Sequence, residues 1–268
     1  MNDIDRIPFK QDEERVKDKD LFETVEEVFD TATVMTIIEL IRRRVIKKLN
    51  GVINSGKEAR IYLGYDLNNK PIAVKIYLTS TSEFKKGMHK YIKGDPRFNG
   101  IKLSNTKLLV YTWAKKEFRN LKRMYEAGVK VPKPIACLNN VLVMEFLGEN
   151  NTRYPLLIEA YGDLEEDELE RIYSLVIDEI EKIACKARLV HGDISEYNIV
   201  VKPSPEIDIF LIDVGQAIDL SHPSAWELLL RDIRNINRFF SKKTNIIVLD
   251  EDKIVERVKP CLEKRKES

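Results

Sequence analysis

Residues His191–Asn198 read HGDISEYN, and the apolar run Ile199–Val201 follows them directly. A second acidic position, Asp213, opens the sequence DVG and comes after the apolar run Ile209–Leu211. An Asp, four spacers and an Asn, then a strand, and then Asp-x-Gly at the end of another strand is an arrangement found in phosphoryl-transfer sites. A single His-Gly-Asp is common in loops, so the prediction of a catalytic site rests on the two segments together.

The chemistry explains the residue types in these two segments. The Asp193 carboxylate can accept a proton from an attacking hydroxyl group or orient a water molecule, which makes it the candidate base. Asn198 and Asp213 offer the hard oxygen ligands that Mg²⁺ prefers, and the metal would neutralise charge that develops on the phosphates. Gly215 is expected to let the chain turn sharply just after the metal ligand.

The composition is that of a globular protein, with 268 residues, 43% of them hydrophobic. No apolar run approaches the ~18 residues that a membrane span needs, and the N-terminal sequence lacks the features of a secretory signal. We therefore expect a cytoplasmic protein without membrane contact. The net charge of +1 gives no global basic field, so we expect no DNA binding, and any contact with RNA must be local.

The three cysteines, Cys137, Cys185 and Cys261, lie far apart in the sequence, without a Cys-x-x-Cys pair or a nearby His cluster. An odd number of cysteines at such spacing predicts reduced thiols in a cytosolic protein and argues against a zinc site.

Residues 1–45 are expected to form an N-terminal arm and a helical extension. Residues 1 to about 20 are mostly charged, which predicts a mobile arm. A short helix is expected over Glu23–Phe29 and a second over Thr31–Arg44, with Asp30 as its N-cap. The cluster Arg42–Arg44 suits the C-terminal end of that helix dipole, an interpretation that we prefer to an RNA contact without excluding the latter.

Residues 46–146 are expected to form an N-terminal lobe that begins with strands Ile46–Ile53 and Arg60–Tyr65 on either side of the loop NSGKEA. Such a lid can present backbone N–H groups to phosphates. Its candidate nucleotide-binding residues are Ser55, Gly56 and Lys57. The loop matches most of a Walker A motif, but Glu58 replaces the required Ser or Thr and a strand is expected to follow, so we reject that motif.

The expected strand Pro71–Tyr77 carries Lys75 in the sequence Ala-Val-Lys, which matches the kinase strand whose Lys holds the α- and β-phosphates. A helix expected over Thr112–Ala127 supplies a Glu that can pair with this Lys. We choose Glu117 over Glu126 for that role, because Glu117 lies early on the inward side of the helix.

Two further strands, Ile135–Leu138 and Val141–Phe146, are expected to end the sheet where the two lobes join. There the backbone groups of Glu145 and Leu147 could read the edge of an adenine. Residues 147–268 are expected to form a C-terminal lobe that is mostly helical. Its expected helices span Asp167–Ala187, Ala225–Phe240 and a short segment from Asp250.

The segment Thr79–Thr106 shows neither helical nor strand periodicity and is expected to be a long insertion. It concentrates basic residues among interleaved aromatic ones. Its lysines include Lys85, Lys86, Lys90 and Lys93. This composition fits a solvated loop and a surface that faces RNA or the ribosome about equally well, so both interpretations stay open.

With these segments in view, the chain resembles the RIO-type atypical protein kinases, and within that family it is similar to the first, most widespread branch. The matching segments are Asn54–Ala59, Ala73–Lys75, Glu117–Phe118, Met144–Phe146, His191–Asn198, Asp213–Ala217 and Ser221–Pro223. The resemblance covers roughly residues 25–260, and the combination of Ser-Glu-Tyr-Asn with Ser-His-Pro is more specific than any single motif.

The resemblance implies an α+β fold of the bilobal protein-kinase type, with an antiparallel sheet plus a helix in the N-lobe and a mostly helical C-lobe. It also implies the use of ATP and Mg²⁺, with Mn²⁺ as an alternative metal. A role in maturing the small ribosomal subunit follows as well, with the precursor of that subunit and its rRNA as partners.

The family's ATP contacts carry over to Lys75, Glu145 and Leu147. Its base carries over to Asp193, and its metal ligands carry over to Asn198 and Asp213. RIO enzymes are associated with an aspartyl-phosphate intermediate, so Asp213 is also the candidate phosphate acceptor of a slow ATPase.

Two departures from ordinary protein kinases keep other functions open. Gly192 stands where those enzymes usually carry Arg, and only nine residues separate Gly215 from the helix expected at Ala225, which leaves no room for an activation loop. A small-molecule phosphotransferase of the aminoglycoside-kinase type is therefore an alternative, since such enzymes also carry His-Gly-Asp. A ribosome-assembly factor that uses ATP only as a switch is another.

Overall fold

The computed structural model describes residues 29–78, 88, 91, 92, 95, 97, 105–203 and 205–263. The expected arm over residues 1–20, the expected helix up to residue 28 and most of the segment Thr79–Thr106 lie outside these residues. In the described part of the chain, no helix has the length and apolar character needed to cross a membrane.

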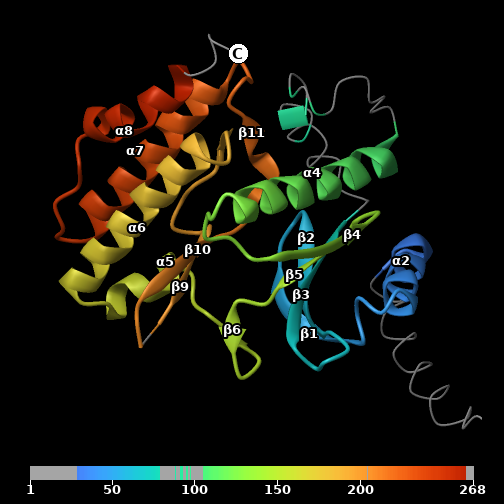
Figure 1. Cartoon of the computed structure of the whole chain (residues 1–268). Helices are drawn as coiled ribbons and strands as arrows, with labels where there is room; N and C mark the ends of the chain where they lie inside the picture. The colour runs from blue at the N-terminus through green and yellow to red at the C-terminus, as the bar shows by residue number, and fades with distance from the viewer. Residues whose placement is uncertain are drawn as a thin grey trace, which may run out of the picture.

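Two lobes make up the molecule (Figure 1). The N-terminal lobe combines a five-stranded sheet with helices α2 (Thr31–Arg42) and α4 (Thr106–Glu126). The C-terminal lobe is built mainly from the helices α6 (Glu166–Cys185), α7 (Ala225–Lys243) and α8 (Glu251–Glu263). The expected α+β, bilobal protein-kinase-like fold is confirmed.

The sheet is antiparallel throughout, with the strand order β1-β2-β3-β5-β4. Its strands are β1 (Lys48–Ser55), β2 (Ala59–Tyr65), β3 (Pro71–Tyr77), β4 (Pro134–Leu138) and β5 (Val141–Glu145). A strand follows the NSGKEA loop directly, so the rejection of a helix-starting phosphate loop at this position is confirmed.

The central strand β3 explains how Lys75 reaches the site. Successive side chains of a strand point to opposite faces. Ile72, Val74 and Ile76 all lie in the buried cluster that α2 covers, whereas Ala73 and Tyr77 lie in the clusters on the opposite face, which also contain residues of α4. The alternation therefore places Lys75 on the face that carries α4 and looks toward the C-terminal lobe.

Helix α4 begins at Thr106, about a turn and a half earlier than predicted. The Asn105 side chain accepts a hydrogen bond from the Lys107 N–H at 2.8 Å and caps the helix. Packing adds to this cap, because Leu109 and Val110 of the first turns are buried against the lobe. A preceding segment rich in Lys and Gly had concealed this start in the sequence.

Short elements of the C-terminal lobe carry the motif segments. They are β6 (Gly148–Glu149), β7 (Thr152–Arg153), α5 (Leu157–Ala160), η2 (Tyr161–Asp163), β8 (Leu189–Val190), β9 (Ile199–Lys202), β10 (Asp208–Leu211), η3 (Val214–Gln216) and β11 (Ile218–Asp219). Strands β9 and β10 form an antiparallel hairpin. The candidate residue Asn198 therefore immediately precedes the first strand of this hairpin, and Asp213 follows the second.

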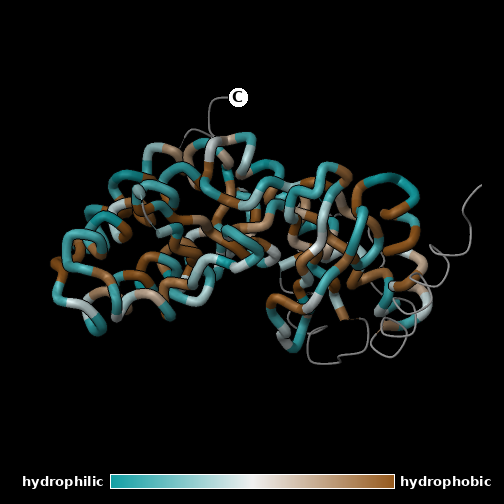
Figure 2. The backbone as a smooth tube through the Cα atoms, turned by 90° about the horizontal axis from the view of Figure 1, so that it is seen from below, coloured by the Kyte–Doolittle hydropathy of each residue, from teal (hydrophilic) through white to brown (hydrophobic). Residues whose placement is uncertain are grey.

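Apolar segments run through the inside of both lobes, and hydrophilic ones lie mostly on the outside (Figure 2). The larger core lies in the C-terminal lobe, where Ile172, Val176 and Ile180 of α6 pack with Ile233 and Ile236 of α7. The same core continues into the N-terminal lobe along the inner end of α4. Buried apolar packing is therefore continuous through the junction between the lobes.

The prediction that all three cysteines are reduced is wrong. Cys185 and Cys261 form a disulfide, with a Cα–Cα distance of 4.9 Å across a sequence separation of 76 residues. Helix α8 folds back onto α6, where Ile254 and Val258 join the core, and this packing brings the two thiols together. Sequence spacing carries no information about that packing. Cys137 is free.

Candidate active site

A cavity of about 320 Å³ opens between the lobes and collects nearly all the predicted site residues. Its lining comes from the NSGKEA loop, β3, α4, the β9–β10 hairpin and the segment Met144–Leu147 where the lobes join, called the junction segment below. Predicted residues on its wall are Gly56, Lys57, Lys75, Glu117, Glu145, Leu147, Asn198 and Asp213. Segments that lie far apart in the chain thus contribute to one site.

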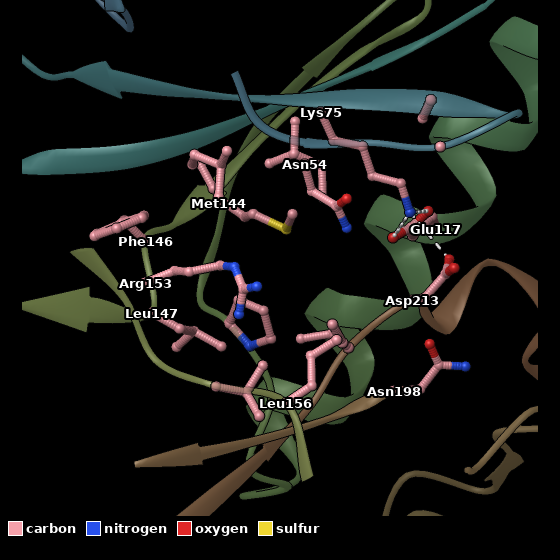
Figure 3. A pocket seen from close by; sticks show the side chains of 18 of the residues that line it. Asn54, Lys75, Glu117, Met144, Phe146, Leu147, Arg153, Leu156, Asn198 and Asp213 are labelled. Carbon is pink, nitrogen blue, oxygen red and sulfur yellow. Dashed lines mark hydrogen bonds and ion pairs between the residues drawn. The ribbon is translucent and has the colours of Figure 1, made fainter. Parts of the chain in front are cut away.

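Lys75 joins the two lobes inside this cavity (Figure 3). Its Nζ donates to both carboxylate oxygens of Glu117 at 3.0 Å and to Asp213 Oδ1 at 3.0 Å. The expected pairing of Lys75 with Glu117 is therefore present. Glu126 instead lies on the surface, 3.7 Å from the Lys122 ammonium.

Charge and burial act in opposite directions in this triad. Burial disfavours the Lys75 ammonium, but the charges of Asp213 and Glu117 outweigh it and raise the Lys75 pKa. Burial raises the pKa of Glu117, although Lys75 opposes the shift. The charge of Lys75 lowers the pKa of Asp213, whose side chain is 49% exposed and opens onto the cavity. The site thus holds a fixed cation beside an accessible anion.

Asp193 lies under a small network of amide donors. Gln216 Nε2 donates to Asp193 Oδ2 at 3.0 Å, and Asn198 Nδ2 donates to the Asp193 backbone oxygen at 2.8 Å and to Oδ2 at 3.2 Å. Burial, and then the charge of Asp213, raise the Asp193 pKa to about 6. Because the amide nitrogen of Asn198 points toward Asp193, the amide oxygen of Asn198 points toward the cavity.

A buried aspartate that was not predicted from the sequence, Asp232, holds the backbone of the HGD segment through hydrogen bonds. Asp232 of α7 is buried, and its carboxylate accepts hydrogen bonds from Gly192 N at 2.7 Å and Ile194 N at 2.9 Å. Arg231 donates to the Gly192 carbonyl. The available signal was an Asp at helical spacing among the apolar residues of α7, since a carboxylate in such a place needs partners.

Asp213 itself makes the turn that was expected at Gly215. Its φ is 59° and its ψ 56°, in the left-handed region, whereas Gly215 has no positive φ. A Cβ at Gly215 would lie 3.0 Å from the Trp113 indole nitrogen. The glycine is therefore needed for close approach to α4, and the expectation that it provides the turn is wrong.

The junction segment offers an apolar slot with backbone polar groups at its edge. Met144 and Phe146 line the cavity with Glu145 and Leu147. The Glu145 N–H already donates to Lys133 O at 2.9 Å, and the Leu147 carbonyl accepts from Tyr154 N at 3.0 Å. The Glu145 carbonyl and the Leu147 N–H are the groups in this segment suited to an adenine edge.

The NSGKEA loop covers the cavity from the N-terminal lobe. Gly56 and Lys57 line it, together with Glu58, while Ser55 is not among the lining residues. The Gly56 N–H donates to Ala59 O at 3.0 Å within the loop. Burial, and then the charge of Asp213, raise the pKa of Glu58. Glu58 is thus a further carboxyl group on the cavity wall.

The donor set fits magnesium. In the described part of the chain no three His, Cys, Asp or Glu side chains gather into a metal-binding group. The Asp213 carboxylate and the Asn198 amide lie side by side on the cavity wall and are the candidate metal ligands. Mg²⁺ is typically held by one or two protein oxygens plus phosphates and waters, so this sparse set suits it.

Sequence comparisons identify relatives of this chain. The RIO domain family model matches residues 60–254. The chain is 38% identical over 248 residues to the RIO-type serine/threonine-protein kinase Rio1 of Haloferax volcanii, which covers 90% of this chain and 82% of that protein. It is 38% identical over 229 residues to the human serine/threonine-protein kinase RIO1, covering 85% of this chain but only 39% of the human protein.

Solved structures of Rio2 kinase from Chaetomium thermophilum share the fold. One has a TM-score of 0.64 at 22% identity and covers 87% of this chain and 72% of its own. A second, described as the Rio2 kinase-ADP/Mg2+-phosphoaspartate complex, has a TM-score of 0.62 at 20% identity, with coverages of 87% and 70%. The family match and the Rio1 relatives show that this chain belongs to the RIO domain family, as an atypical serine/threonine-protein kinase of the Rio1 type.

Proposed function

We propose that the cavity binds ATP with Mg²⁺ or Mn²⁺ and transfers its γ-phosphate. The observation that carries the proposal is the Lys75 ammonium, fixed 3.0 Å from both Glu117 and Asp213 at the junction of the lobes. Lys75 binds the α- and β-phosphates, and Glu117 orients it. Glu145 and Leu147 bind the adenine edge through their backbone groups. The lid that contains Ser55, Gly56 and Lys57 covers the phosphates, with Gly56 and Lys57 facing the cavity.

Asn198 and Asp213 would hold the metal, which supplies charge neutralisation at the phosphates when it is bound. Asp193 accepts the proton of the attacking group, either a protein hydroxyl or a water molecule. The amides of Gln216 and Asn198 hold the Asp193 carboxylate in one orientation. Its raised pKa brings the base closer to neutral pH, as suits proton transfer under physiological conditions.

Asp213 is also the proposed phosphate acceptor. One of its carboxylate oxygens attacks the γ-phosphorus, the bond to the bridging oxygen of ADP breaks, and an aspartyl-phosphate remains. Water then attacks that phosphorus, Asp193 takes a proton from the water, and the bond between phosphorus and the Asp213 oxygen breaks, so that inorganic phosphate leaves and the Asp213 carboxylate is restored. The half-exposed carboxylate is accessible for the first step, and the Rio2 complex with ADP, Mg²⁺ and a phosphoaspartate supports such chemistry in this fold.

Chemical lability of the labelled protein tests the acceptor. Incubation with γ-labelled ATP should leave label that hydroxylamine removes, because hydroxylamine cleaves an acyl phosphate but not a phosphoserine. Mass spectrometry should locate it on Asp213, and Asp213→Asn should abolish it. Hydroxylamine-resistant label on a serine would exclude the intermediate and leave Asp213 as a metal ligand alone.

The wider role proposed for the enzyme is in maturation of the small ribosomal subunit, as a kinase or ATPase that binds the precursor and its rRNA. The kinship with Rio1 enzymes and the basic segment Thr79–Thr106 support it. Crosslinking in cell extract should recover small-subunit rRNA as the main adduct. Recovery of a small-molecule acceptor activity without an rRNA adduct would favour the phosphotransferase alternative.

A further inference from the structure

Helix α4 carries two buried polar side chains that the proposed reaction does not use. Lys116 Nζ donates to the backbone carbonyls of Gly215, at 2.7 Å, and Ala217. Asn120 Nδ2 donates to the carbonyls of Val214 at 2.8 Å and Ala217 at 3.0 Å. Both side chains are 0% exposed. Four side-chain hydrogen bonds thus join α4 to the segment just after Asp213.

That segment needs to be held. Asp213 adopts a left-handed backbone conformation, which is unfavourable for a residue other than glycine and persists where the surroundings enforce it. The Trp113 ring packs closely against Gly215, so that a Cβ there would lie only 3.0 Å from the indole nitrogen. Packing from Trp113 and hydrogen bonds from Lys116 and Asn120 therefore fix the same short segment against the same helix face.

Neighbouring residues of α4 hold the other side of the site. Glu117 directly follows Lys116 and binds Lys75, so one turn of the helix contacts both the lysine that pairs with Asp213 and the segment that follows Asp213. In ordinary protein kinases the placement of the corresponding helix is controlled through a phosphorylated activation loop. Here only nine residues separate Gly215 from α7 at Ala225.

We propose that Lys116 and Asn120 are positioning residues that lock the strained Asp213 turn to α4 and so hold its carboxylate in the geometry for metal binding. They perform a task that activation-loop contacts perform elsewhere. The proposal rests on the function proposed above for Asp213 as a metal ligand, and it adds residues for which no role in that reaction was assigned.

Arg97, in the segment Thr79–Thr106, adds a hydrogen bond that orients the Asn120 side chain. Its Nη1 donates to Asn120 Oδ1 at 2.7 Å, which turns the amide nitrogen of Asn120 toward the carbonyls of Val214 and Ala217. Asp95 is fully buried and holds the Arg97 guanidinium through Nε at 2.9 Å and Nη2 at 2.6 Å. The orientation of the Asn120 amide therefore depends on Arg97.

A direct measurement of metal binding distinguishes a positioning role of Lys116 and Asn120 from a role in stabilising the fold alone. Mn²⁺ is titrated into the full chain saturated with ADP and followed by electron paramagnetic resonance, and ADP binding without metal is measured by calorimetry. The variants are Lys116→Met, which keeps the length of the side chain without its donors, and Asn120→Asp, which keeps the shape of the amide. Lys115→Met, an exposed neighbour on α4, is the matched control.

We expect Mn²⁺ affinity to fall by about 10-fold or more in both variants, the scale on which removing a supporting group weakens a metal site. ADP affinity without metal should stay within about twofold of wild type, and kcat should fall while the KM for ATP changes little. Mn²⁺ binding equal to that of Lys115→Met, in protein that melts cooperatively, would overturn the proposal.

Two further outcomes are distinct. If Lys116→Met does not fold, Asn120→Asp still decides the question, because Asp keeps an oxygen acceptor for Arg97 and replaces the amide donors to Val214 and Ala217 by a negatively charged oxygen. If wild-type protein with ADP binds no Mn²⁺, the assignment of Asp213 as a metal ligand is wrong, and the positioning role proposed for Lys116 and Asn120 is wrong as well.

Discussion

Lys75 shows how one side chain ties the two lobes together. A buried ammonium is costly unless it is paired, and here Glu117 from α4 and Asp213 from the C-terminal lobe both contact it at 3.0 Å. The arrangement leaves a net negative site in the absence of ligand. Phosphates and a divalent cation together can satisfy both signs of charge.

Replacing this lysine should remove a preorganised charge from the site. We expect Lys75→Ala to lower ATP turnover by about 10²-fold or more, as is typical when a fixed electrostatic group is removed. Steady-state ATPase assays on protein with an unchanged circular dichroism spectrum measure the effect. Lys70→Ala, at an exposed lysine just before the same strand, is the control. Undiminished turnover in Lys75→Ala would refute the assignment of Lys75.

Lys116 predicts a pH dependence of stability. Burial, and then the charge of Arg97, lower its pKa to about 7, although Asp95 opposes the shift. An unfolded chain keeps this proton up to about pH 10.4. Between about pH 7 and 10 the unfolded state therefore binds more protons than the native state, so the free energy of unfolding rises with pH. A neutral amine still donates to the Gly215 and Ala217 carbonyls.

Urea unfolding at pH 7, 8 and 9 checks this prediction. Relative to wild type, Lys116→Met should lose stability progressively as the pH rises, because it lacks the group that supplies the slope. Lys115→Met, in which the exposed neighbour is changed, should follow wild type. Parallel curves for wild type and Lys116→Met would show that Lys116 keeps an ordinary pKa.

Among the helices of the C-terminal lobe, α7 contacts the candidate site directly, whereas α8 contributes only to the packing of the lobe. Helix α7 lies under the catalytic segment, and its Asp232 fixes the backbone of Gly192 and Ile194. Helix α8 is remote from the cavity and packs on α6 and α7. Its attachment to α6 is covalent as well, through Cys185 and Cys261.

Removing that disulfide should weaken the fold and leave the chemistry in place. Cys185→Ser is expected to lower the free energy of unfolding by about 2–4 kcal/mol, since the bond restricts a long loop of the unfolded chain. Guanidinium unfolding without reductant measures the decrease, and reductant should lower wild type to the same level. Cys137→Ser, at the free cysteine, is the control. Coincident curves for wild type and Cys185→Ser would contradict a bonded pair.

For the whole molecule, charge distribution matters more than net charge. The total is only +1, whereas the segment Thr79–Thr106 concentrates lysines, all of which lie outside the described residues. Its described residues Met88, Ile92 and Arg97 pack or bond onto α4. A partner bound by this segment would therefore contact a region directly connected to the active site.

Salt dependence of RNA binding tests the segment. Changing Lys85, Lys86, Lys90 and Lys93 to Ala should weaken binding to small-subunit rRNA and reduce the log–log salt slope by nearly one unit for each phosphate that the segment no longer binds. The control changes four exposed lysines of the C-terminal helices and so makes the same change in net charge. These are Lys242, Lys243, Lys253 and Lys259. Equal affinity and slope in both variants would make the segment a solvated loop.

Sequence alone was enough to predict the family, the two lobes and the candidate site residues Gly56, Lys57, Lys75, Glu117, Glu145, Leu147, Asn198 and Asp213 that line the cavity. Motif spacing placed Asn198 before a strand and Asp213 after one, and the match of Ala-Val-Lys to a kinase strand picked out Lys75. Helical spacing selected Glu117 over Glu126. These features depend on neighbours within one element, and local periodicity reports such neighbours directly.

Tertiary structure alone decided the support of the site and the state of the thiols. Lys116 meets the Gly215 carbonyl across 99 residues, Asp232 meets Gly192 across 40, and Cys185 meets Cys261 across 76. Each contact depends on how one helix packs against a distant segment, which no local pattern encodes. The left-handed turn at Asp213 belongs to the same class, because the contacts of α4 hold a conformation that its own sequence does not favour.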